Sequence, residues 1–547
     1  MITPRQRSWL PGLLAIGLRV AVASAAMDYS TKGSTISYPV TVNGIHLLAA
    51  SARDIAEALN QQHVTSEQLV DAYIARIEAN DRTGLNLQSV IEIAPTAREV
   101  AKKLDEERQS GAIRSAIHGL PILVKDNTEL GVNTTAGSYA LLGSHASGDA
   151  FVVKKLRDAG AIILGKANLN EFSGQRGAVN SSAWSARGGR ISSAYVFGGF
   201  SAGGDPSGSS GGSAVSVSAG FAAAALGTDT EGSIGSPANR AALFGLRPST
   251  GLTSRTGVVP ISSSQDTTGP LAKSVWDVAA LLEIMAVHDD EDAYSAAAEP
   301  FRLKNYTQFV DGPSFKGLRV GVPREPFWNQ TFQQYRAATN PALDAVLDKM
   351  RDLGAEIIDP VVLPNEADWR YPFVGGAKRD SAGAIIIQHD TKEDMANYLT
   401  RYRTNTTGME SLFDIISFNE ANVELESAPG VYGQDSFLAA DQTGPRNTSS
   451  EYWHAKYVQE QLGKDGIEAV FRLHKLDVLA VPTEGSASRF GAVGRCPVGN
   501  VPVGYDEINL PFGMSFVGKR YDEATVLRAM AAFEANFPAR ELPPTLD

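Results

Sequence analysis

Two serines and one lysine stand out because of the segments that carry them. Ser209 and Ser233 lie 24 residues apart, each in a loop rich in glycine and serine, and Lys125 ends an apolar run that starts at Leu120. A lysine at the end of a buried strand is costly to keep charged, and a neutral lysine accepts protons. The three side chains could supply a nucleophile, a relay and a base without any histidine. This combination predicts serine-based cleavage of an amide bond.

The loop that carries Ser209 is unusually rich in glycine, with seven glycines in residues 198–212. One interpretation is a flexible linker. Linkers usually join polar segments, whereas this stretch leads into the small and apolar residues 214–226, for which we predict a closely packed, buried helix. A glycine-rich loop at the start of such a helix presents backbone N–H groups and the positive end of the helix dipole. That arrangement suits a reacting carbonyl.

Two other motifs have weaker support. Residues 160–166 nearly match a phosphate-binding loop, but Ala167 stands where a serine or threonine should bind the metal, and the interior is strand-forming. Residues 208–212 match the elbow of α/β-hydrolases with Ser210 as nucleophile, yet no strand-like run precedes them and no histidine lies in a distinctive loop downstream. We therefore expect neither nucleotide binding nor that hydrolase fold.

The composition is that of an ordinary globular protein. The 547 residues are 43% hydrophobic and 20% charged, with a net charge of −12 and no cluster of lysine and arginine, so no nucleic-acid partner is expected. The lone Cys496 excludes an intrachain disulfide and favours a packed thiol. Among the eight histidines no metal-ligand spacing occurs. We expect no metal and no cofactor.

The N-terminus resembles a secretory signal. Arg5 and Arg7 precede the mostly apolar residues 9–18, and Ala23 to Ala25 offer a small-residue cleavage site. We predict a signal peptide over residues 1–25, a lead-in segment over 26–46 and a secreted glycoprotein, with a cytoplasmic location as the alternative. No later run is long enough to span a membrane. Six N-glycosylation sequons fit this route: Asn133, Asn180, Asn305, Asn329, Asn405 and Asn447.

Alternating strand and helix patterns predict an α/β fold. Apolar residues 120–124 and 161–164 suit strands buried on both faces, and a helix is predicted between them at 151–159. Thr65 with Gln68 predicts a capping box at a helix start. We also predict helices at 50–59, 96–110, 341–353 and 522–537, and strands at 90–93, 317–322, 355–358 and 477–481. Because the sequence shows no internal repeat and no linker, we predict one large domain over residues 47–547.

Lys125, Ser209 and Ser233, in the setting Gly208-Ser-Ser-Gly-Gly-Ser213 and Gly227-Thr-Asp-Thr-Glu-Gly-Ser-Ile234, resemble the amidase signature family of serine hydrolases. The resemblance covers nearly the whole chain after the lead-in and is strongest to the peptide-amidase-like branch. It implies a large mixed central sheet covered by helices on both faces, and hydrolysis of a linear carboxamide without a cofactor.

The family resemblance also implies a role for each residue. Ser233 would be the acyl-forming nucleophile. Ser209, after a cis peptide bond from Gly208, would bridge Ser233 and Lys125. The backbone N–H groups of four consecutive residues would form the oxyanion hole: Thr230, Glu231, Gly232 and Ser233. Burial behind the strand at 122–124 would keep Lys125 neutral enough to act as a base.

Two positions depart from the family pattern. Many relatives have glycine where Glu231 stands, so this residue is strained if its φ must be positive, and otherwise its carboxylate lines the site. Many relatives also have arginine where Gly235 stands. The expected substrate is a small-molecule or peptide amide, with no obligate partner protein. The alternatives are an A-type subunit of a glutamine-dependent amidotransferase and a catalytically inactive binding protein.

Overall fold

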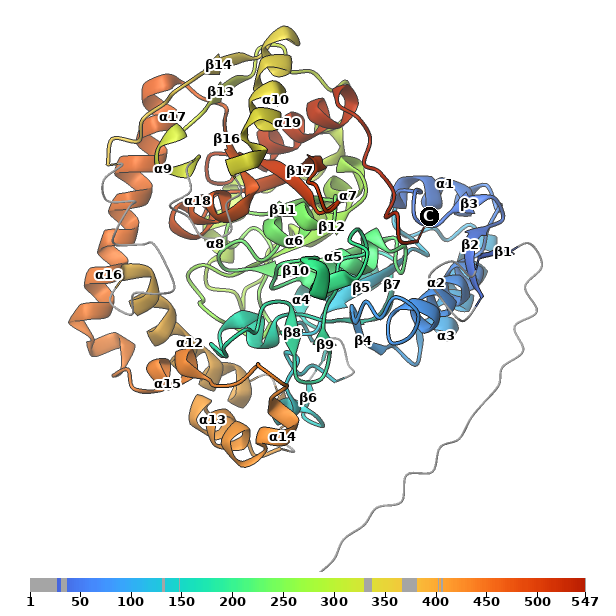
Figure 1. Cartoon of the computed structure of the whole chain (residues 1–547), viewed down its shortest axis with the longest axis horizontal. Coiled ribbons are helices and arrows are strands. Elements are labelled where there is room, and N and C mark those ends of the chain that lie inside the picture. Colours follow the sequence, from blue (N-terminus) through green and yellow to red (C-terminus); the bar gives the residue numbers. More distant parts are fainter. Residues whose placement is uncertain are drawn as a thin grey trace, which may run out of the picture.

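An eleven-stranded mixed sheet crosses the molecule and is flanked by helices (Figure 1). The computed structural model describes residues 27–30, 37–129, 133–146, 148–328, 337–365, 381–401, 403–404 and 407–546, so the predicted signal peptide lies outside it. In sheet order the strands are β14 (Glu356–Ile358), β13 (Arg319–Gly321), β16 (Val478–Pro482), β18 (Pro511–Val517), β17 (Val498–Tyr505), β11 (Phe244–Arg247), β12 (Thr267–Ala272), β10 (Ala224–Asp229), β5 (Pro121–Lys125), β7 (Ile162–Ala167) and β4 (Val90–Ile93).

Three neighbouring strands, β10, β5 and β7, are parallel to one another and buried over their whole length. β13 is parallel to β14 and β16, and the remaining pairs of this sheet are antiparallel. Strands covered on both faces read as continuous apolar runs. The prediction of buried strands at 120–124 and 161–164 is therefore confirmed, as is the mixed α/β fold.

Most predicted helices are present within a residue or two. The capping box is confirmed: the Thr65 hydroxyl accepts from the Gln68 N–H, and the Gln68 side chain accepts from the Thr65 N–H. The main helices are α1 (Ala52–Asn60), α2 (Ser66–Asn80), α3 (Ala97–Gln109), α4 (Phe151–Asp158), α5 (Gly211–Ser218), α6 (Gly235–Arg240), α7 (Val275–Met285), α10 (Asn340–Asp352), α12 (Ala382–Arg401), α13 (Leu412–Ala421), α15 (Asp435–Asp441), α16 (Ser450–Gln461), α17 (Ala469–His474), α18 (Ser488–Gly494) and α19 (Glu523–Asn536).

The prediction of a single helix over residues 214–226 is wrong. Helix α5 ends at Ser218, Gly220 adopts a φ of 66°, and β10 begins at Ala224. Alanines favour a helix in isolation, but here they form a strand paired on both sides, with β5 and with β12. Tertiary pairing thus overrides local propensity. The consequence matters for the site, because β10 leads directly into the loop of Ser233.

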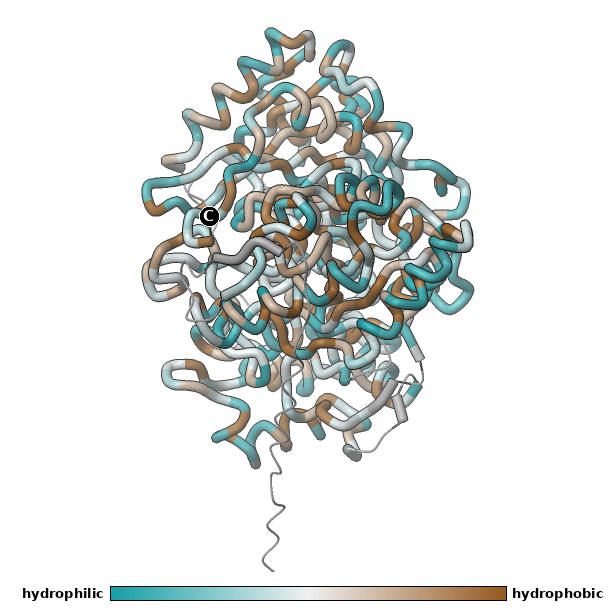
Figure 2. The backbone as a smooth tube through the Cα atoms, turned by 90° about the vertical axis from the view of Figure 1, so that its right-hand side faces the viewer, coloured by the Kyte–Doolittle hydropathy of each residue, from teal (hydrophilic) through white to brown (hydrophobic). Residues whose placement is uncertain are grey.

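Residues 27–30 and 37–46, which fall within the predicted lead-in, belong to the folded body. They form a small sheet of β1 (Met27–Ser30), β2 (Tyr38–Val42) and β3 (Ile45–His46). The buried guanidinium of Arg76 on α2 donates to the carbonyls of Pro39, Ala219 and Gly220, and so joins this sheet to the end of α5. One hydrophobic core extends from Tyr38 to Leu546. Hydrophobic stretches gather in the middle of the molecule (Figure 2).

The sequons differ in accessibility. The Asn133 amide nitrogen donates to Glu92, and that of Asn180 donates to the Gly430 carbonyl. Asn180, Asn305 and Asn447 are exposed and Asn133 is half-buried, whereas the other two sequons lie outside the described residues. Attachment of a glycan would disrupt the first two contacts, so Asn305 and Asn447 are the better acceptors. Within the described part of the chain no helix is both long and apolar enough to cross a membrane. Secretion stays a prediction.

Candidate active site

Lys125 lies at the carboxyl end of β5 with a fully buried side chain. Its Nζ is 2.7 Å from the Ser209 hydroxyl oxygen, 2.8 Å from the Thr228 hydroxyl oxygen and 3.3 Å from the Thr228 carbonyl oxygen. The Thr228 hydroxyl also accepts a hydrogen bond from the Asn127 side-chain amide at 2.9 Å. Strand β10 supplies Thr228, so the parallel pairing of β5 and β10 positions the lysine against its partners.

Burial lowers the pKa of Lys125 from its ordinary value to about 7, and the nearby carboxylates of Asp229 and Asp266 partly oppose this shift. A neutral amine has two N–H donors and one lone pair. The two oxygens of Thr228 can accept both donors, which leaves the lone pair for the Ser209 hydroxyl proton. The surroundings of Lys125 therefore suit a base that takes a proton from Ser209.

Ser209 follows a cis peptide bond from Gly208, as the resemblance to amidases implies. Its side chain is buried, and its carbonyl accepts a hydrogen bond from the Asn170 N–H at 3.1 Å. The next residue, Ser210, donates its N–H to the Ser233 carbonyl at 3.2 Å. Through this contact the structure places the two serine loops side by side, although they are separated in sequence.

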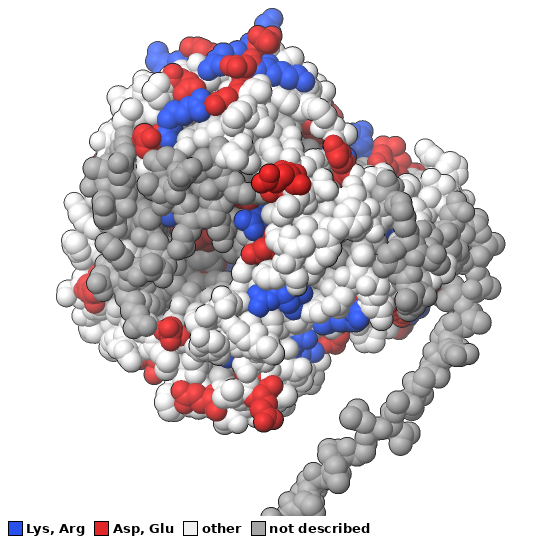
Figure 3. Space-filling model, viewed as in Figure 1, with Lys and Arg blue, Asp and Glu red and all other residues white. Residues whose placement is uncertain are grey.

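Ser233 itself is half-buried, and its hydroxyl forms no hydrogen bond with any described residue. It lies just before α6, in the loop that follows β10. The face drawn in Figure 3 is hollowed between the positions of α18 and α12, with acidic and basic side chains on the walls. The expected hydrogen bond between Ser209 and the Ser233 hydroxyl is thus not formed, but an accessible hydroxyl on a loop that contacts the loop of a buried serine–lysine pair suits a nucleophile.

The loop of Ser233 is held by a buried ion pair that the sequence did not reveal. Asp229 accepts hydrogen bonds from the N–H groups of Gly232 at 2.9 Å and Ile234 at 2.7 Å. Arg247 donates to the Asp229 carboxylate at 2.6 Å and to the Thr230 carbonyl at 3.2 Å. An aspartate shortly before a tight turn is a local signal that could have been read. Arg247 carries no such signal, because it reaches the loop from β11, which β12 separates from β10 in the sheet.

The expected oxyanion hole is only partly available. The Gly232 N–H already donates to Asp229, so it does not point at a substrate oxygen. The N–H groups of Thr230, Glu231 and Ser233 have no acceptor among the residues that the structure describes. Three of the four predicted donors thus remain candidates, and the fourth supports the loop.

A second buried carboxylate, also missed from the sequence, lies behind this loop. Asp266 accepts from the Thr230 hydroxyl at 2.5 Å and from the N–H groups of Ile261 at 2.8 Å and Ser262 at 3.0 Å. Burial raises the pKa of Asp266 to about 6. Asp266 orients Thr230 and adds negative charge near Lys125.

The backbone at Glu231 is not strained. The positive φ of this turn, 98°, belongs to Gly232, whereas Glu231 is not among the residues with positive φ. The Glu231 side chain is accessible to solvent, yet the surrounding protein raises its pKa, with Arg489 acting in the opposite direction. A side chain that solvent can reach but that has protein on most sides is typical of the wall of a cavity. The carboxyl group is therefore a candidate for the wall of the site beside Ser233.

The alternative motifs have structural roles. Residues 160–166 run into β7, where the buried Lys166 donates to the Thr128 carbonyl at 2.6 Å, so they form no phosphate loop. Ser210 is fully buried, and its hydroxyl donates to the Thr228 carbonyl. Cys496 is buried, and burial raises its pKa to about 12. Across the described ranges no group of three or more His, Cys, Asp or Glu is placed to hold a metal ion.

The chain is similar in sequence to a known family of proteins. The family model described as Amidase matches residues 68–494. The chain is 37% identical to a probable amidase of Arabidopsis thaliana over 89% of each chain. It is 32% identical to the A-type subunit of the glutamyl-tRNA(Gln) amidotransferase of Chloroflexus aurantiacus, over 90% of this chain and 96% of that one.

Solved structures agree with the sequence comparison. The native peptide amidase from Stenotrophomonas maltophilia is similar, with a TM-score of 0.81 and 35% identity over 90% of this chain and 98% of that one. An amidase family protein from Bacillus anthracis has a TM-score of 0.78 at 30% identity, over 91% of this chain and 92% of that one. With its family model, relatives and fold in agreement, the chain belongs to the amidase signature family and is an amide-hydrolysing enzyme.

Proposed function

We propose that this amidase hydrolyses the terminal carboxamide of peptides or small linear amides, releasing ammonia, by a Ser233–Ser209–Lys125 relay. The observation that carries the proposal is the 2.7 Å contact between Lys125 Nζ and the Ser209 hydroxyl in a fully buried setting next to the loop of Ser233. The similarity to a peptide amidase over nearly the whole chain supports this substrate class.

In the first half-reaction the Ser233 oxygen attacks the amide carbonyl carbon. Its proton passes to Ser209 as the proton of Ser209 passes to neutral Lys125. The N–H groups of Thr230, Glu231 and Ser233 stabilise the negative oxygen that forms, and one such donor is typically worth about 3–4 kcal/mol. They are fixed before the reaction because Asp229 and Asp266 hold the loop from behind.

Collapse of the tetrahedral intermediate breaks the carbon–nitrogen bond. The Lys125 ammonium returns its proton through Ser209 to the leaving nitrogen, and ammonia departs from the acyl-enzyme. Water then attacks the acyl carbonyl, with its proton taken by the same relay, and Ser233 regains its proton as the acid is released. Asp229 and Asp266 favour the transient ammonium.

The wall of the site argues for a substrate without a carboxylate next to the scissile amide. Glu231 places a carboxyl group on the loop of Ser233, and Gly235 offers no cation where many relatives have arginine. A peptide amide is neutral at its scissile end. The amidotransferase alternative is retained, since an amidotransferase relative matches 90% of this chain, and free glutamine therefore belongs in the substrate panel.

The first test measures ammonia release from peptide amides, aryl amides, fatty amides and glutamine by the purified chain. We expect release from peptide amides and a loss of at least about a thousandfold in Ser233→Ala, because the nucleophile is removed. A fluorophosphonate that labels wild type but not Ser233→Ala identifies the reactive serine. Release from glutamine alone would favour the amidotransferase alternative, and absence of both labelling and turnover would favour the binding-protein alternative.

The pH dependence of kcat/KM tests the base. Activity should fall as the pH drops below about 7, because the relay needs neutral Lys125. Asp266→Asn removes a negative charge that raises the pKa of Lys125, so the acid limb should move to lower pH by about half a unit to one unit. The exposed Asp352→Asn is the matched control. An acid limb that stays in place in Asp266→Asn contradicts the assigned coupling.

The charge of Glu231 should set substrate preference. Glu231→Gln keeps the shape of the side chain and removes its charge. We expect the ratio of kcat/KM for succinamate to that for neutral butyramide to rise about tenfold, since the repulsion of the substrate carboxylate is lost. Glu67→Gln, at the surface on α2, controls for a general charge effect. An unchanged ratio would mean that Glu231 does not face the substrate.

A further inference from the structure

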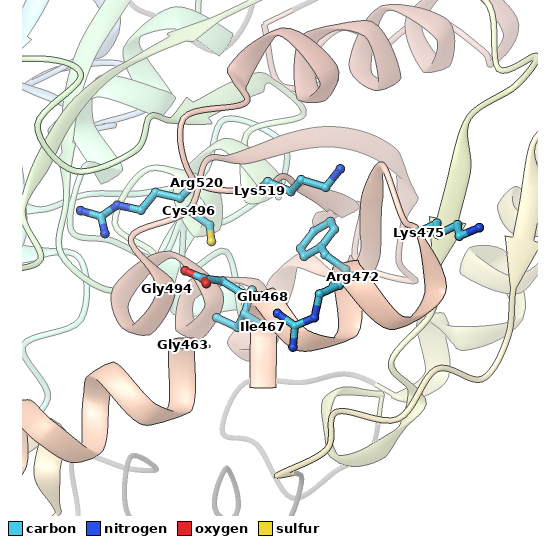
Figure 4. A pocket seen from close by; sticks show the side chains of 10 residues that line it. Gly463, Ile467, Glu468, Arg472, Lys475, Gly494, Cys496, Lys519 and Arg520 are labelled. Carbon is cyan, nitrogen blue, oxygen red and sulfur yellow. The ribbon is translucent and has the colours of Figure 1, made fainter. Parts of the chain in front are cut away.

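A second cavity, of about 430 Å³, lies away from the catalytic residues (Figure 4). One wall is a π-helical segment, Leu462–Glu468, which joins α16 to α17. This segment contributes Ile467 and Glu468 to the wall, and α17 contributes Arg472. The other wall holds Cys496, which follows α18, and Lys519, which follows β18. π-Helical turns are rare and frequently lie at functional sites.

The interior of this cavity is apolar. Ile467, Phe471 and Cys496 are almost fully buried and line it. Gly494 completes the wall, and a Cβ added there would approach the Ile467 side chain to 2.6 Å and Cys496 Sγ to 2.8 Å. The two walls thus meet closely behind the cavity, while the space in front of them stays open. A volume of a few hundred Å³ with an apolar lining is typical of small-molecule sites.

The mouth of the cavity is cationic, although the chain as a whole has a net charge of −12. Four basic side chains line it with a single acid, Glu468: they are Arg472, Lys475, Lys519 and Arg520. Lys519 Nζ lies 5.9 Å from the centre of the Phe471 ring, so charge and apolar surface adjoin. The Arg520 Nε is buried and has no hydrogen-bond acceptor in the described part of the chain. In Figure 4 the Lys475 and Arg520 side chains turn away from the cavity, and Arg520 Nη2 donates to the Tyr521 hydroxyl at 3.1 Å. Arg472 and Lys519 are therefore the groups that offer donors and charge to an anion.

We propose that this cavity binds a small amphipathic anion, with its apolar body against Ile467 and Phe471 and a single carboxylate or sulfonate at the cationic mouth. Long basic side chains cover apolar surface with their stems while their charged ends stay in water. A ligand with both parts therefore matches the cavity better than a neutral alkane or an inorganic anion. This site is distinct from the catalytic one and independent of the function proposed for it.

The cavity touches the helix that supports the catalytic loop. Gly494, at the end of α18, lines the cavity, whereas the Gly491 carbonyl of the same helix accepts a hydrogen bond from Arg247 at 3.0 Å. Ser488, at its start, packs so closely on Gly232 that a Cβ added to the glycine would lie 2.7 Å from the serine Cβ. Helix α18 thus separates the two sites and contacts both.

The test is a fluorescence titration of the full chain with 1-anilinonaphthalene-8-sulfonate, which is itself an amphipathic anion. We expect one saturable site per chain, from which octanoate displaces the probe, whereas octanol and acetate do not. Arg472→Glu combined with Lys519→Glu reverses two charges at exposed mouth positions and should raise Kd at least about tenfold. Glu468→Gln removes the opposing carboxylate and should lower Kd.

Lys464→Glu is the matched control, because Lys464 is exposed on the same π-helical segment and does not line the cavity. Its Kd should equal that of wild type. Since this probe also binds loosely packed proteins, near-ultraviolet circular dichroism must be unchanged in each variant that is compared. The proposal is overturned if no saturable binding is found, if the double variant binds like wild type, or if octanol competes as well as octanoate.

Discussion

The burial of a single lysine is the constraint on which the rest of this structure depends. At its ordinary pKa of 10.5, keeping Lys125 neutral at pH 7 would cost about 4–5 kcal/mol. Removing the ammonium from water supplies that shift, because β5 lies between β7 and β10 and is covered along its whole length. A lysine on an edge strand or near a helix end could extend its side chain to solvent. The position of β5 within the sheet therefore prepares Lys125 for the role of base that we propose.

Burial by itself would make the lysine neutral but would not organise a reaction. Thr228 accepts its N–H groups and leaves its lone pair facing Ser209, while Asp229 and Asp266 are close enough to stabilise the ammonium when it forms. The same two carboxylates hold the loop of Ser233. In the proposed mechanism, proton transfer and oxyanion stabilisation thus rest on one group of buried side chains, in which Arg247 balances the charge of Asp229.

Local sequence patterns were enough to predict the parts of the site that local chemistry determines. The apolar run before Lys125 and the Gly/Ser loops of Ser209 and Ser233 indicated the three residues of the proposed relay. The Thr65 capping box and the buried strands are confirmed. Wherever distant strands decide the outcome, the sequence was insufficient. Residues 224–226 became part of β10 because β5 and β12 pair with them. Arg247 and Asp266 reach the loop through strand order, and the Gly232 N–H turned out to be engaged by Asp229. No pattern indicated the cationic cavity beside the π-helical segment.

The central claim, that Lys125 is a buried lysine poised to lose its proton near neutral pH, is tested most directly by nuclear magnetic resonance titration of the side-chain nitrogen. Lysine labelled with ¹⁵N at Nζ would be incorporated into the full chain, and the Lys125 signal assigned by its absence in Lys125→Arg. We predict a titration midpoint near pH 7. A midpoint near 10.5, the value of an ordinary lysine, would contradict the account and require a different base.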